Sequence, residues 1–330
     1  MVAKLIHGTT QAAGDHVSND FMLHINLVLK GNAIPGTEIA AHLEGRGMWI
    51  AKDPKQTPIP PMYGIWFLNT ATTPYTVISR SESLAELHLA SVILPENTPA
   101  GTSGNTPEAS VAGEIISALR WLADQKSAAE FRTLAEDFRT LTPSTTLPFY
   151  RELASERSPL LTAAGIEGLI AANDPEGVIL AAAWSEPLPP SLGPSLMAYS
   201  NQDPAGVRAL GTLALRGSPF EENVAYALRA IHTRETLPAL ASLLDAKNPE
   251  VQSRALSGFC LFVRNAPAIT PQSVPSMAWL ETRQPAPLLT TETQGYCHPG
   301  GTVYPAGSAT EYVAFWKSWW SSHQSELEQP

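Results

Sequence analysis

The pattern of apolar and polar positions changes its period along the chain. Near the N-terminus the two kinds alternate, the period of a half-buried strand, at Phe21, Leu23, Ile25, Leu27 and Leu29. An unbroken apolar run at 65–68 indicates a strand that is buried on both faces. From about residue 110 the period becomes helical, with apolar side chains on one face at Val111, Ile115, Leu119 and Leu122. The pattern predicts strands first and helices afterwards.

Segments rich in proline, glycine and small polar residues divide this pattern. Residues 54–61 predict a surface loop, and residues 96–109 have the composition of a linker. Residues 265–308 are long for a loop without secondary structure, which is typical of a functional or disordered segment. We therefore expect an α+β chain of two domains, divided into a β domain at 1–95, a linker at 96–109, helical repeats at 110–264, and a loop with a C-terminal helix at 265–330.

Helix starts recur with one chemistry, a capping residue followed by proline. The capping side chain accepts a hydrogen bond from an unpaired backbone N–H, and proline is preset for the first helical position. The dipeptides are Asp174-Pro175, Asp203-Pro204, Ser218-Pro219 and Asn248-Pro249. Their spacing is uneven, so the helical array is predicted to be irregular.

The clearest pair of helices lies at 237–263. Its residues resemble a HEAT repeat, an armadillo-like unit, over Leu237-Pro238-Ala239-Leu240, Leu243-Leu244-Asp245, Val251 and Arg254-Ala255-Leu256. The resemblance implies antiparallel helix pairs stacked into an α-solenoid over about 110–264, with a surface for protein binding. The sequence departs from the repeat at Gln252, where a basic residue is expected, and this argues against an Asp–Arg ladder.

The N-terminal region resembles the small OB-like barrels of netrin-type domains. The resemblance rests on Val28-Leu29-Lys30-Gly31, on Pro35-Gly36 before a strand, and on the segment from Tyr63 to Leu68. It implies a small closed barrel over 1–95. A β-sandwich is the alternative fold.

Composition narrows the classes of partner. The net charge is −10, and no dense cluster of Lys and Arg occurs, so we expect no nucleic-acid partner. No apolar run approaches the ~18 residues of a membrane-spanning helix, so we expect no transmembrane segment. The residues after Met1 do not have the pattern expected of a signal peptide. Scarce lysine with abundant Ser, Thr and Pro favours an extracytoplasmic chain whose signal was removed, with a cytoplasmic protein as the alternative.

The chain has two cysteines, Cys260 and Cys297. Two cysteines alone cannot build a structural zinc site, and these do not form a CxxC pair. They are candidates for one disulfide if the chain is exported, and free thiols are the alternative. A nucleophile–base pair of Cys297 with His298 is the weakest interpretation, because adjacent side chains rarely point at one another.

The predicted C-terminal helix carries aromatic side chains every three or four residues. We expect Phe315, Trp316 and Trp319 to be the core of a capping helix that covers the last apolar face of the array. The alternative is an exposed aromatic platform for a ligand. Ser308 and Glu311 have the spacing of a capping box that would start this helix.

Familiar catalytic signatures are missing from the chain. His7, Asp15 and His16 surround a predicted turn and are expected to be solvated polar residues. We predict no cofactor and no metal, and a non-enzymatic binding or scaffolding protein that contacts another protein through the repeats. The alternative is an enzyme or enzyme subunit with its site at the domain junction, built from the loops at 54–61 and 265–308.

Overall fold

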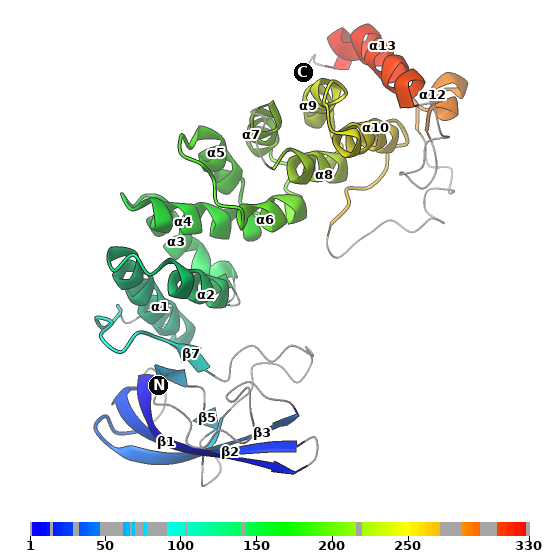
Figure 1. Ribbon diagram of the computed structural model, residues 1–330. Helices are drawn as coiled ribbons and strands as arrows, with labels where there is room; N and C mark the ends of the chain where they lie inside the picture. Colours follow the sequence, from blue (N-terminus) through cyan, green and yellow to red (C-terminus); the bar gives the residue numbers. More distant parts are fainter. Residues whose placement is uncertain are drawn as a thin grey trace. The chain divides into compact units, whose positions relative to one another are not determined.

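In the computed structural model, the chain forms a sheet followed by helices (Figure 1). This order confirms the predicted α+β class. The chain divides into two compact units, Met1–Phe149 and Tyr150–Pro330. The described residues are 2–13, 16–28, 33–46, 62–66, 68–69, 75–77, 91–102, 104–139, 141, 143–215, 220–270, 286–297 and 309–327.

The described residues of the first unit form a seven-stranded sheet with the order β5-β6-β3-β2-β1-β4-β7. Neighbouring strands pair antiparallel except β3 and β6, which pair parallel. The strands are β1 (Val2–Ala13), β2 (His16–Leu27), β3 (Glu38–Arg46), β4 (Met62–Trp66), β5 (Leu68–Asn69), β6 (Tyr75–Val77) and β7 (Ser91–Ile93). The long β1–β2 and β2–β3 ladders form the centre of this sheet.

Alternation along β2 places apolar side chains on one face of the sheet. Leu23 and Ile25 are fully buried, whereas His24 between them is partly exposed. Leu5 from β1 and Ile65 from β4 are buried as well. These positions follow the period of two that the sequence predicts for a half-buried strand.

The first unit also contains α1 (Pro107–Asp124), α2 (Ala128–Arg139) and the first part of α3 (Pro143–Ala154). The chain before α1 lies against that helix: Ser117 Oγ donates to the Pro99 carbonyl at 2.7 Å. A Cβ on Gly113 would lie only 2.3 Å from the Thr102 carbonyl oxygen. The stretch at 96–109 therefore belongs to the first unit. The boundary between the two compact units lies between Phe149 and Tyr150, within α3.

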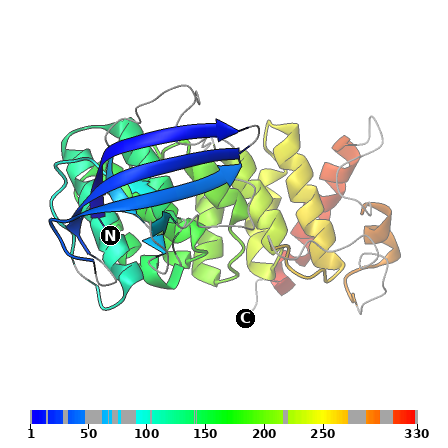
Figure 2. The ribbon, with the colours of Figure 1, turned by 90° about the horizontal axis from the view of Figure 1, so that it is seen from below.

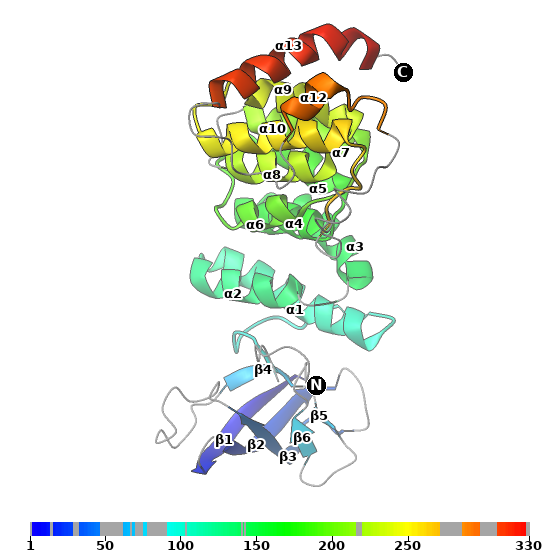
Figure 3. The same cartoon turned by 90° about the vertical axis from the view of Figure 1, so that its right-hand side faces the viewer.

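Helices of the second unit alternate between two rows (Figures 1 and 3). Contacts join α4, α6, α8 and α10 into one row, and α5, α7, α9 and α13 into the other. The bounds are α4 (Pro159–Ala171), α5 (Pro175–Ala183), α6 (Leu192–Ala198), α7 (Pro204–Leu215), α8 (Glu221–Ile231), α9 (Leu237–Leu243), α10 (Pro249–Val263), α12 (Thr291–Gly295) and α13 (Ala309–Leu327). Consecutive helices thus bury their apolar faces between the rows.

Side-chain caps start several of these helices as the sequence predicts. The side chains of Asp174 and Asn248 accept from backbone N–H groups in the first turns of α5 and α10, and Asp203 does so in α7. Ser218 and Pro219 lie outside the described residues. Each cap satisfies an N–H group that has no partner within its helix.

One hydrophobic core runs through both rows of the second unit. It extends from Ile166 in α4 to Trp316 and Leu327 in α13. Figure 2 shows the helices of this unit from another side. Among the described helices, none combines the length and apolar character that crossing a membrane requires.

Candidate functional site

A grouping of partly buried polar side chains lies between α8 and α10 in the second unit. Arg229 of α8 bonds Ser257 of α10, twenty-eight residues further along the chain. The ring of Tyr226 contacts the guanidinium of Arg254, which is also twenty-eight residues further along the chain. A constant separation means that the two helices run parallel and in register, so their side chains form rows across the helix pair.

Two guanidinium groups flank one aromatic ring at this face. The guanidinium carbon lies 5.7 Å from the Tyr226 ring centroid for Arg229 and 5.3 Å for Arg254, within the range of cation–π attraction. Arg229 Nε donates to Ser257 Oγ at 2.9 Å. Arg254 forms an ion pair with Glu250. We call these five residues the Arg–Tyr cluster.

The cluster combines positive charge with a buried donor. Arg254 Nε is buried and has no hydrogen-bond partner among the described residues, whereas 21% of the Arg254 side chain remains accessible. Within the cluster, the guanidinium of Arg254 pairs with the carboxylate of Glu250. Chemically, this arrangement can bind a carboxylate, because guanidinium forks match that group in two-point hydrogen bonds.

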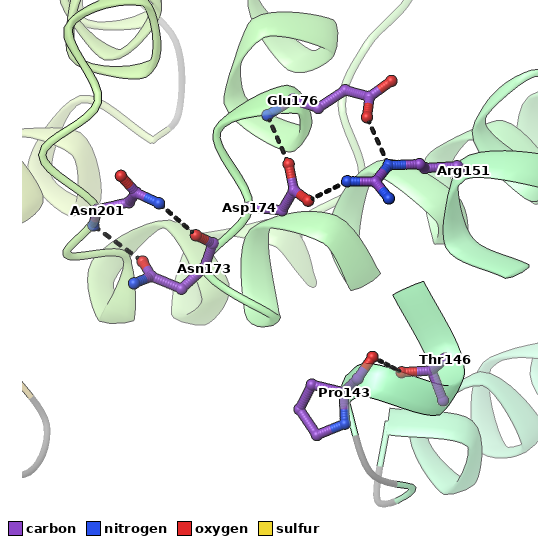
Figure 4. A network of polar contacts seen from close by, with 7 residues as sticks. All are labelled: Pro143, Thr146, Arg151, Asn173, Asp174, Glu176 and Asn201. Atoms are coloured by element: carbon purple, nitrogen blue, oxygen red, sulfur yellow. Dashed lines mark hydrogen bonds and ion pairs between the residues drawn. The ribbon is translucent and has the colours of Figure 1, made fainter. Parts of the chain in front are cut away.

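The turns between helices form a second polar network (Figure 4). The Asn173 side-chain oxygen accepts from the backbone N–H groups of Ser200 and Asn201, at 2.9 Å each. Asn201 Nδ2 donates back to the Asn173 carbonyl at 2.9 Å. Asn173 has a positive φ of 61°, a conformation that asparagine tolerates better than most residues. The network joins the α4–α5 turn to the α6–α7 turn.

Arg151 extends this network at the end of α3. It donates to Asp174 at 2.7 Å and to Glu176 at 2.8 Å. These hydrogen bonds and charges raise the pKa of Arg151. Figure 4 also draws a local bond from the Thr146 hydroxyl to the Pro143 carbonyl in the first turn of α3. The contacts of Arg151 hold the capped start of α5.

His232 joins the ends of α8 and α10. Its ring nitrogens lie 3.0 Å from the Arg229 carbonyl oxygen and 2.8 Å from that of Ala266. The residue is buried and has a positive φ of 34°. Burial lowers the pKa of His232, and the carbonyl contacts act in the opposite direction. The imidazole therefore links two turns within one row of helices.

The aromatic residues of α13 divide between two contacts. Trp316 is fully buried and stacks on Phe259 of α10, with centroids 5.3 Å apart, and Trp319 packs edge-on against the same ring at 6.0 Å. Phe315 is only partly buried and stacks on Tyr296 at 3.9 Å. Trp316 and Trp319 thus pack on α10, whereas Phe315 packs on the chain just after α12.

Cys260 and Cys297 form a disulfide with a Cα–Cα distance of 5.3 Å. It ties the chain after α12 to α10. Two hydrogen bonds from side chains to backbone carbonyls lie at the same junction. Trp316 Nε1 donates to the Tyr296 carbonyl, and the Arg264 side chain donates to the Cys297 carbonyl, both at 3.3 Å. His298 lies outside the described residues.

The other sequence candidates are only partly described. Asp15, Ser308 and the loop at 54–61 lie outside the described residues, as do the side chains of His7 and His16 and most of the loop at 265–308. On the sheet, His42 Nδ1 lies 2.6 Å from an Asp20 carboxylate oxygen. In the part of the chain that the structure describes, no group of three or more His, Cys, Asp and Glu side chains could hold a metal ion.

Sequence reasoning missed the Arg–Tyr cluster and the asparagine network. The only available signal for the network was Asn173 itself, an asparagine placed after a helical stripe and before a cap, where a positive φ is common. The cluster had no comparable signal, because it depends on the register between two helices.

No family model matches the chain, and neither does any curated protein or solved structure.

Proposed function

We propose that the second unit is a HEAT-like, armadillo-like α-solenoid and that the chain is a non-enzymatic binding or scaffolding protein. The observation that carries the proposal is the alternation of helices between two rows, with one continuous core between the rows. Such arrays expose long helical faces that bind other proteins. The face of α8 and α10 is the proposed contact surface, because Tyr and Arg are enriched at the energetic centres of interfaces.

The proposal includes α13 as the cap of the array. Its inner side contributes Trp316 and Trp319 to the core. Its outer side carries exposed serines at Ser318, Ser321 and Ser322. A helix that is aromatic inside and polar outside covers the end of a repeat array without leaving an apolar surface.

For the sheet we propose an OB-like barrel in preference to a sandwich. Strand β1 pairs with both β2 and β4, and β3 pairs parallel with β6. Strand β5 pairs with β6 and begins two residues after β4 ends. Because β4 and β5 are almost continuous in the chain, these pairings are those expected of a sheet that closes on itself.

An extracytoplasmic location completes the proposal. The disulfide between Cys260 and Cys297 supports it, because disulfides persist in oxidising compartments and are rare in the cytosol. In such a compartment the junction of α10, α12 and α13 stays covalently closed.

Site-specific photo-crosslinking in the producing cells tests the proposed contact surface. A photoreactive amino acid would replace Glu222, an exposed residue one turn before Tyr226 on α8. The matched control replaces Arg208, an exposed residue of α7 in the other row. We expect a discrete protein adduct from position 222 that is absent from position 208. Equal adducts at both positions, or none at 222, would contradict the proposed surface.

A further inference from the structure

The boundary between the two compact units falls inside a single helix. Helix α3 runs from Pro143 to Ala154, and the first unit ends at Phe149. Pro148 occupies the interior of this helix, directly before the boundary. We propose that α3 is a hinge that bends at Pro148 and lets the first unit turn relative to the second. The hinge is separate from the contact surface proposed for α8 and α10.

The first half of α3 is fixed to other helices of the first unit. The ring of Phe149 packs edge-on against Phe138 of α2, with centroids 6.3 Å apart. The Thr145 hydroxyl donates to the Glu108 carboxylate of α1 at 3.3 Å, and Thr146 is buried. Because these contacts tie the turns before the boundary to α1 and α2, this half of the helix moves with the first unit.

The second half of α3 is fixed to helices of the second unit. A Cβ on Gly165 of α4 would lie 2.6 Å from the Tyr150 carbonyl oxygen, and one on Gly168 would lie 2.1 Å from the Tyr150 ring. Glycine at these two positions lets α4 approach α3 closely. Arg151 also forms an ion pair with Asp174 at the start of α5, at 2.7 Å (Figure 4). The turn after the boundary therefore moves with the second unit.

Pro148 weakens the helix at the point where these two anchored halves join. Proline has no N–H to donate to the carbonyl four residues earlier, that of Ser144, and its ring crowds that carbonyl. Sharp bends in helices are found mostly at proline for this reason. The Pro148 ring is exposed, so packing in the core does not require a proline here. Bending at this position breaks fewer hydrogen bonds than bending elsewhere in α3.

Position within the helix distinguishes Pro148 from prolines that begin helices. At the first helical position the N–H has no partner within the helix, so proline costs little there. Pro143 occupies that position in α3, as do Pro159, Pro175, Pro204 and Pro249 in their own helices. Pro148 lies five residues further on, where a proline removes an internal hydrogen bond. Pro143 therefore offers a matched control in the same helix.

The distribution of distances across α3 tests the hinge. Nitroxide labels would be attached through a ketone-bearing amino acid at Glu130 of α2 and Arg208 of α7, which are both exposed. This chemistry leaves Cys260 and Cys297 untouched. Pulsed electron spin resonance of the full chain then measures how widely the distance between the two labels varies. We expect a broad distribution in the native chain and one about twofold narrower in Pro148→Ala, because alanine restores the missing N–H donor.

Two controls separate the hinge from other sources of spread. A label pair inside the second unit, at Arg208 and the exposed Ser321, measures the width that the labels themselves contribute. That width should be the same in the native chain and in Pro148→Ala, which also shows that the variant is folded. Pro143→Ala makes the same chemical change at the first position of α3 and should keep the broad distribution of the native chain.

Three results would overturn the hinge. The first is a native distribution across α3 as narrow as that of the pair inside the second unit, because the two units would then be rigidly joined. The second is equal breadth in the native chain and Pro148→Ala, because the movement would then arise outside the proline turn. The third is equal narrowing in Pro143→Ala and Pro148→Ala, because the effect would then not depend on the internal hydrogen bond.

Discussion

The indole of Trp316 stacks on the ring of Phe259, with centroids 5.3 Å apart and planes inclined by 22°. Both residues are fully buried. The contact joins α13 to α10 across a separation of more than fifty residues in the chain. It is the centre of the junction that closes the helical array.

Removing the Trp316 side chain should therefore destabilise the second unit strongly. Truncating a buried aromatic residue costs about 3–5 kcal/mol, so Trp316→Ala should lower the midpoint of thermal unfolding by roughly 10 °C. Circular dichroism at 222 nm measures this change. Ser321→Ala, on the exposed side of the same helix, is the control and should melt as the native chain does. Native-like melting of Trp316→Ala would favour a ligand platform over a cap.

The disulfide should contribute to stability through the loop that it closes. Cys260 and Cys297 are 37 residues apart, and closing a loop of that length restricts the unfolded chain by about 3–4 kcal/mol. Chemical denaturation with and without reductant should show a loss of that order. A Cys260→Ser/Cys297→Ser double variant should show no dependence on reductant. Two free thiols in the unreduced, denatured native chain would contradict the bond.

Asn173 should stabilise the turn network in two separable ways. It occupies a positive φ of 61° and accepts from the N–H groups of Ser200 and Asn201. Asn173→Gly keeps the backbone conformation accessible and loses the hydrogen bonds, at a cost of about 1–3 kcal/mol. Asn173→Ala loses the bonds and adds about 1 kcal/mol or more of backbone strain. Urea unfolding should rank the native chain first, the glycine variant second and the alanine variant last.

An alanine variant as stable as the glycine variant would show that the backbone at Asn173 is not constrained. Native-like stability of both variants would show that the two hydrogen bonds contribute nothing measurable. The second outcome would remove the assigned role of this turn in joining neighbouring helix pairs, and the first would remove only the backbone contribution.

Local patterns predicted the parts of the fold that local physics decides. The alternation at Leu23 and Ile25 is sufficient to place a strand, because successive side chains point to opposite faces. Asp174 and Asn248 mark helix starts because each cap bonds an N–H only two residues away. In both cases the interacting groups are close in sequence.

The register between elements that are distant in the chain could not be predicted from the sequence. The pairing of Arg229 with Ser257 depends on how two helices slide and rotate against each other, and neither stripe specifies that. The position of Phe315 also depends on a distant segment. Its spacing is that of a core residue, but its ring stacks on Tyr296 in the chain after α12. The chain near Pro99 has the composition of a linker, yet its carbonyl bonds Ser117 in α1.

The pH dependence of stability should carry a signature of His232. The ring is buried at the junction of α8 and α10, and its burial lowers the pKa from the ordinary value of about 6.5. Arg229, the charged group that acts on the ring, lowers the pKa as well. Because the folded pKa lies below the unfolded pKa, the unfolded chain takes up a proton first as the pH falls. The contribution to stability is complete above about pH 6.5 and declines below it.

His232→Asn is the variant that isolates this titration, since asparagine accepts a positive φ and does not titrate. We expect urea unfolding at pH 7.5 and pH 5.5 to show a larger loss of stability for the native chain than for His232→Asn. A direct titration of the ring by nuclear magnetic resonance should give a pKa below 6.5. The contrary result, a pKa above 6.5, would mean that an imidazolium donates to both carbonyls, those of Arg229 and Ala266, and that these bonds outweigh burial. In that case acid would stabilise the junction. The free energy of unfolding of the native chain would then rise relative to that of His232→Asn as the pH falls.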